Sequence, residues 1–92
     1  MNVEQETRLW KGINNAILEM DFQRAMSISD ALYAGLYKDY TSSSNLDEKR
    51  RITNDLNYLI GLDKTLFMSS KLRDSMQGLS DRLDEGEEWK KQ

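Results

Sequence analysis

The chain has 92 residues, 38% of them hydrophobic and 32% charged, which fits one small folded domain over residues 1–92 and excludes a disordered tail. It contains no cysteine and no histidine, so it offers no thiolate, no disulfide and no imidazole base or metal ligand. Its net charge is −3, and the chain lacks the excess of basic residues that is typical of a nucleic-acid-binding protein.

The first predicted helix covers residues 4–20, where apolar residues recur at steps of three and four. Asp21 fits as the N-cap of a second helix that begins at Phe22, but it also fits the interior of one long kinked helix. We favour a break near Met20 and Asp21. The apolar positions of this first helix are Leu9, Ile13, Ala16, Ile17 and Met20.

The second predicted helix covers residues 22–40 and has two apolar faces. Its smaller face comprises Ile28, Ala31, Ala34 and Gly35. A helix that is apolar on two sides lies between two neighbours or offers one side to a partner. The larger face comprises Phe22, Ala25, Met26, Ser29, Leu32, Tyr33, Leu36, Tyr37 and Tyr40.

Residues 41–45 form a polar loop, and a third helix is predicted over residues 46–85. Asn45 fits as its N-cap, with Glu48 reaching back to the amide of Asn45 as in a capping box, and Ser44 with Asp47 offers the same arrangement one residue earlier. Residues 86–92 are predicted to form a frayed end. We interpret the apolar positions of the third helix as one stripe: Ile52, Leu56, Leu59, Leu62, Leu66, Ser69, Leu72, Met76, Leu79 and Leu83.

These elements predict an all-α fold, an antiparallel helical hairpin or bundle with two shorter helices packed on one long helix. The two shorter helices together are about as long as the third, so they are expected to fold back along it. A core of two helical layers is narrow, and at least one apolar flank is expected to stay exposed.

The sequence favours no enzyme activity. Serine and threonine are present without a histidine to activate them, and no phosphate loop, EF-hand or dinucleotide-binding pattern occurs. We therefore predict no catalytic residues, no metal and no cofactor. No apolar run is long enough to span a bilayer and no signal peptide is evident, so we expect a cytoplasmic protein with no membrane partner.

Two sets of apolar residues are candidates for binding a protein partner. Tyrosines 33, 37 and 40 share one side of the second helix, either as core residues with wet hydroxyls or as an aromatic strip for a partner helix. Three further residues lie beside the leucine line of the third helix and would form a groove for an amphipathic helix. A second copy of the chain, in a homodimer, would satisfy the same surface. The predicted partner-binding residues are Tyr33, Tyr37, Tyr40, Ile60, Phe67 and Met68.

Three segments resemble the FliT-type flagellar export chaperones. They are residues 18–22 followed by Ala25, Leu32 and Leu36, residues 59–63 followed by Leu66, and residues 72–76, within a similarity that covers about residues 8–85. The resemblance implies a small helical chaperone that takes part in protein secretion. Its client would be the C-terminal helical segment of a flagellar filament-cap protein. Members commonly have a further C-terminal helix that folds over the binding surface, which we expect these 92 residues to lack.

Two other functions fit the same sequence. One is a small inhibitor of the kind that phages and mobile elements encode, which would block a host enzyme through surface contacts. The other is a structural homo-oligomer. Size, acidity and the surplus of apolar helical surface are compatible with each of them.

Overall fold

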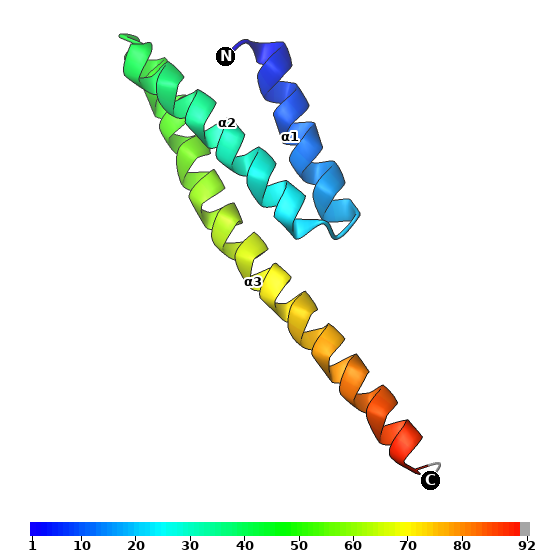
Figure 1. Cartoon of the computed structure of the whole chain (residues 1–92). Helices are drawn as coiled ribbons and strands as arrows, with labels where there is room; N and C mark the ends of the chain where they lie inside the picture. The colour runs from blue at the N-terminus through cyan, green and yellow to red at the C-terminus, as the bar shows by residue number, and fades with distance from the viewer. Residues whose placement is uncertain (91–92) are drawn as a thin grey trace.

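The chain folds into three helices, α1 (Val3–Leu18), α2 (Phe22–Ser42) and α3 (Leu46–Lys90), as Figure 1 shows. This computed structural model describes the backbone of residues 1–90 and the side chains of residues 1–84. The predicted all-α class is confirmed. The helix α3 extends five residues beyond the predicted end at residue 85, and within the predicted frayed end only residues 91–92 lie outside the described residues.

The first turn confirms that α1 and α2 are separate helices. The carboxylate of Asp21 caps α2 by accepting a hydrogen bond from the backbone amide of Arg24, at 3.2 Å. Before it, the amide of Asp21 donates to the carbonyl of Ala16 and the amide of Met20 donates to the carbonyl of Ile17. These two bonds form a Schellman motif, which closes α1 and reverses the direction of the chain.

The loop between α2 and α3 is shorter than predicted, because α2 continues through Ser42. The side chain of Asn45 caps α3, as expected, by accepting from the amides of Asp47 and Glu48. The predicted capping box does not form, because Ser43 lies between its partners. The hydroxyl of Ser43 donates to Glu48 and accepts from the amide of Asn45.

A capping box forms instead at the start of α1, where the sequence analysis did not predict one. The side chain of Asn2 accepts from the amide of Gln5, and the side chain of Gln5 accepts from the amide of Asn2. The N-terminal ammonium also lies 2.8 Å from a carboxylate oxygen of Asp39. These contacts hold the beginning of α1 beside the end of α2.

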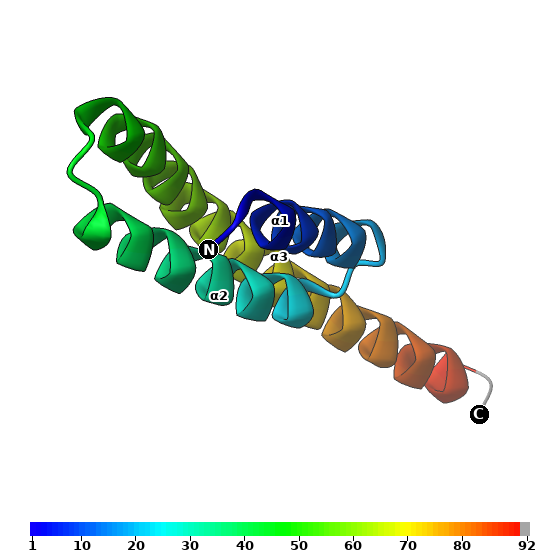
Figure 2. The same ribbon diagram turned by 90° about the horizontal axis from the view of Figure 1, so that it is seen from above.

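Helix α2 packs against both of the other helices, and α1 runs back along it (Figures 1 and 2). Two glycines lie where side chains from neighbouring segments come close. An added Cβ on Gly12 of α1 would lie 3.3 Å from Cδ1 of Ile28 in α2, and one on Gly35 would meet the flexible methyl end of the Met1 side chain. Helix α1 reaches α3 through side chains, among them the rings of Trp10 and Tyr58, whose centroids are 5.9 Å apart.

The core consists of two clusters of buried side chains. The larger contains Ile13 of α1, Leu32 and Leu36 of α2, and three residues of α3. The smaller contains Ala16, Ala25 and Leu66, near the turn between α1 and α2. We call the four buried residues of α3 the core seam: Ile52, Leu56, Leu59 and Leu66.

Helices α1 and α2 cover only the first part of α3, so the expectation that together they would extend along all of it is wrong. The Schellman turn folds α1 back beside α2, and the two helices overlap instead of following one another. Helix α3 therefore projects beyond them, and the molecule measures 71 × 20 × 14 Å (Figure 1). Leu66 is the last residue of α3 that is buried among those with described side chains.

Two leucine substitutions in α3 test this division. Replacing Leu59, which is 1% exposed, by alanine should lower the free energy of unfolding by about 2–4 kcal/mol. Replacing Leu79, which is 59% exposed, by alanine should change it by less than about 0.5 kcal/mol. Urea unfolding followed by circular dichroism measures both. Equal losses would mean that Leu79 belongs to the same core as Leu59.

Candidate functional site

The projecting part of α3 carries a second row of apolar side chains. We call it the distal seam: Leu72, Met76, Leu79 and Leu83. Each of its residues is between 59% and 69% exposed. Their spacing of four, three and four residues is that of a seam against which a partner helix packs.

The distal seam is not a continuation of the core seam. At about 100° per residue, its four residues lie on average about 110° around α3 from Leu66. A seam with a seven-residue repeat drifts by only about 20° per heptad, or about 40° over this distance. The single stripe predicted from residue 52 to residue 83 is therefore wrong, and the structure divides it into two seams.

Beyond the start of α2, polar residues occupy the positions on α3 that continue the core seam. The positions that continue the line of Leu66 are Ser70, Arg73 and Gln77. The side-chain amide of Gln23, near the start of α2, donates a hydrogen bond to the hydroxyl of Ser70. Nothing apolar is therefore left for an extension of α2 to cover, whereas the distal seam stays apolar through Leu83.

The distal seam follows the line of α1 along α3. Tyr58 points in the same direction as the distal seam, about 80° around the helix from Leu66, and it contacts Trp10 of α1. Further along, the guanidinium of Arg73 donates a hydrogen bond of 2.6 Å to the carbonyl of Met20, just after α1 ends. The distal seam thus begins where α1 stops.

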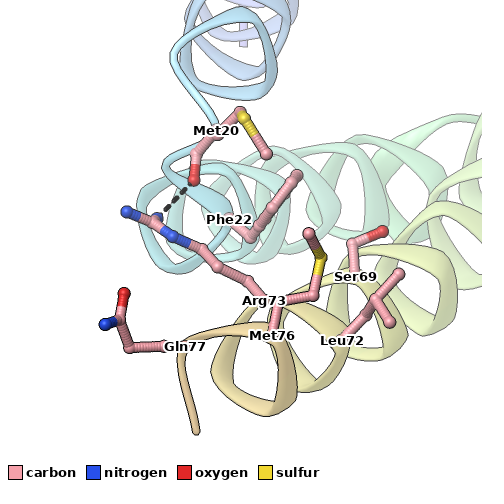
Figure 3. A pocket seen from close by; sticks show the side chains of 7 residues that line it. All are labelled: Met20, Phe22, Ser69, Leu72, Arg73, Met76 and Gln77. Carbon is pink, nitrogen blue, oxygen red and sulfur yellow. Dashed lines mark hydrogen bonds between the residues drawn. The ribbon is translucent and has the colours of Figure 1, made fainter. Parts of the chain in front are cut away.

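A hollow of about 420 Å³ lies in the corner between the α1–α2 turn and α3 (Figure 3). Met20 and Phe22 border it from the turn, and Leu72 and Met76 border it from α3, with Arg73 bonded to the turn at one side. The remaining lining residues are Ser69 and Gln77. This corner is an apolar end wall for anything that packs along the distal seam.

Met20 has a left-handed backbone, with φ of 58°. Glycine is the usual residue at this position of a Schellman motif, because a Cβ in the left-handed region costs roughly 1–2 kcal/mol. Met20 is 56% exposed, so burial of its side chain recovers little of that cost. Residues kept in strained conformations gather at functional sites, and here the strained residue places a thioether in the hollow.

The structure places the three predicted tyrosines in different surroundings. Tyr33 and Tyr40 are half-buried against the larger core cluster, which agrees with the core interpretation. Tyr37 is 53% exposed, and its ring stacks on Tyr33 with centroids 6.5 Å apart. The ammonium of Lys49 lies 5.1 Å from the ring centre of Tyr40.

Of the three predicted partner-binding residues on α3, only Ile60 lies beside one of the predicted tyrosines. It lines a shallow groove between α2 and α3 together with Tyr33. Phe67, which is 52% exposed, lies on the same flank two turns further along, beside the ammonium of Lys71. Met68 is 66% exposed and points about 100° further around α3. The six predicted residues therefore do not form one surface.

The distal seam was not predicted from the sequence, because its residues continue the steps of three and four of the core residues and were interpreted as one stripe with them. The signal was present in the polar residues at positions 70, 73 and 77. They interrupt the register of Leu59 and Leu66 while the apolar residues continue in another register.

No metal-binding group of three or more acidic residues occurs among residues 1–84, whose side chains are described. Within the described part of the chain, no helix is both long and apolar enough to cross a bilayer. Comparison with protein-family models, with curated proteins and with solved structures found no match. The resemblance to flagellar export chaperones therefore rests on the quoted residues alone.

Substitutions at Met20 separate backbone strain from side-chain contacts. Met20→Gly should be more stable than Met20→Ala by about 1 kcal/mol, because both remove the thioether but only glycine relieves the left-handed strain. Thermal unfolding of the two variants measures the difference. Equal stability would show that the backbone at residue 20 is not strained.

Proposed function

We propose that this chain is a cytoplasmic helix-binding chaperone or adaptor, which covers an amphipathic helix of another protein and performs no catalysis. The observation that carries the proposal is the distal seam, an apolar row at helical spacing on a part of α3 that α1 and α2 do not cover. An exposed row of this kind is the form in which one helix receives another.

The composition of the surface suits a binder of helices. Met20 and Met76 are flexible and polarisable, so they adapt to partner side chains of different shape. No residue of the distal seam belongs to the two core clusters, so binding at the distal seam requires no opening of the fold. Within this proposal, the sequence resemblance implies that the client is the C-terminal helical segment of a flagellar filament-cap protein.

A model peptide tests the proposal without knowledge of the natural client. The probe is a labelled helical peptide of about 16 residues, with leucines at seam positions and glutamines flanking them, which matches the roughly 17 Å from Leu72 to Leu83. Met76→Asp should weaken its binding by at least tenfold, because a buried carboxylate would face the peptide, a loss of about 1.4 kcal/mol or more. Fluorescence anisotropy measures the affinity, and circular dichroism should show unchanged helicity.

Phe67→Asp is the matched control, since Phe67 is exposed on another flank of the same helix. It should leave both the affinity and the helicity nearly unchanged. Loss of binding in Phe67→Asp but not in Met76→Asp would place the site on the flank of Ile60 and Phe67 that the sequence predicted. Equal, weak binding to all three proteins would refute the proposed function.

A further inference from the structure

We propose that the helix bound at the distal seam carries acidic residues beside its own apolar residues. This inference rests on the proposed function and specifies the chemistry of the partner. It derives from the charged side chains of α3 that lie nearest to the distal seam.

Two arginines border the distal seam, one on each side. At about 100° per residue, Arg73 and Arg82 each lie about 90° around α3 from the middle of the distal seam. Both are exposed. The other side chains within that distance are uncharged: Met68, Ser69, Ser75 and Ser80.

Among the residues whose side chains are described, the carboxylates of this part of α3 lie further away. Asp74 and Asp81 are on the opposite side, about 170° from the middle of the distal seam, and Asp84 lies about 110° away, as does Lys71. Although the whole chain has a net charge of −3, the borders of the distal seam are therefore basic between residues 68 and 83. Charges that flank a helical seam select the partner, so these borders favour glutamate or aspartate on the bound helix.

The hydrogen bond from Arg73 to the carbonyl of Met20 does not remove this preference. A guanidinium has five N–H donors and keeps its charge, so one bond to a carbonyl leaves donors for a carboxylate. This bond also fixes one arginine beside the hollow, where the end of a bound helix would lie.

The same geometry disfavours a second copy of the chain as the occupant. In a parallel pairing of the two distal seams, the part of the partner's α3 that precedes Leu72 would occupy the space of α1. There Trp10 contacts Tyr58, and Met20, just after α1, contacts Arg73. In an antiparallel pairing the two distal seams would match, with Leu72 and Met76 of one copy facing Leu83 and Leu79 of the other. The residues after Leu83 would then run into the end of α1. Neither pairing supplies a carboxylate to the bordering arginines from residues 68–83.

Two peptides that differ only in their flanking charges test the inference. Both have the leucine seam used above, one with glutamate and the other with lysine at the flanking positions. The glutamate peptide should bind roughly fivefold more tightly in fluorescence anisotropy, since two exposed ion pairs together contribute on the order of 1 kcal/mol. Raising the salt concentration should reduce this ratio by screening.

Arg82→Gln should reduce the ratio to about twofold, while Lys11→Gln, an equal change of charge on α1, should leave it unchanged. Equal affinity for the two peptides, or preference for lysine, would overturn the inference while leaving helix binding intact. Concentration-dependent dimerisation that Met76→Asp abolishes would also overturn it, because a second copy would then occupy the distal seam.

Discussion

The reversal of the chain at Met20 determines what the rest of the molecule is able to bury. If α1 and α2 followed one another along α3, they would cover most of its length. The Schellman turn lays α1 beside α2 instead, so that α2 packs on the first part of α3 and α1 reaches the same part through side chains. The distal part of α3 is left without an intramolecular partner among the described residues, and the exposed apolar row follows directly from this arrangement.

The sequence of α3 matches this division closely. As far as Leu66, its buried apolar residues face α1 and α2, and beyond Leu66 the same line carries serine, arginine and glutamine. A helix segment that packs against nothing is expected to carry polar residues on every side, because exposed apolar side chains promote aggregation. Instead a new row of leucines and a methionine begins in another direction. Its alignment with α1 indicates that a single helix, placed end to end with α1, would cover it.

The sequence predicts the helices well because their signals are local. Asp21 and Asn45 are strong N-caps, and the spacing of Leu32, Leu36, Leu59 and Leu66 defines faces that become the core. The overlap of α1 with α2 was not predictable in the same way. It depends on a left-handed residue at position 20, where a methionine stands in place of the glycine that signals such a turn.

The candidate site was missed for a related reason. Steps of three and four residues fit any apolar row on a helix, and they do not say whether one direction or two are involved. The part of α3 that α1 and α2 cover, together with the polar residues at positions 70, 73 and 77, shows that Leu72 and Leu83 face a different direction from Leu59. The predicted tyrosines show a related ambiguity. Tyr33 and Tyr40 were candidates for either core or surface, and both pack against the core while remaining partly exposed.

The distal part of α3 is also the part whose stability depends most on a partner. Helices in water draw most of their stability from packing of an apolar face, and a single segment of 12–15 residues is marginal without it. Gly78 weakens the intrinsic helix preference further, and a Cβ placed there would meet no neighbour within 4 Å. A bound helix would therefore supply the packing that α1 and α2 provide to the first part of α3. Because the core seam lies elsewhere on the helix, this binding surface can change residue by residue with little effect on the stability of the fold.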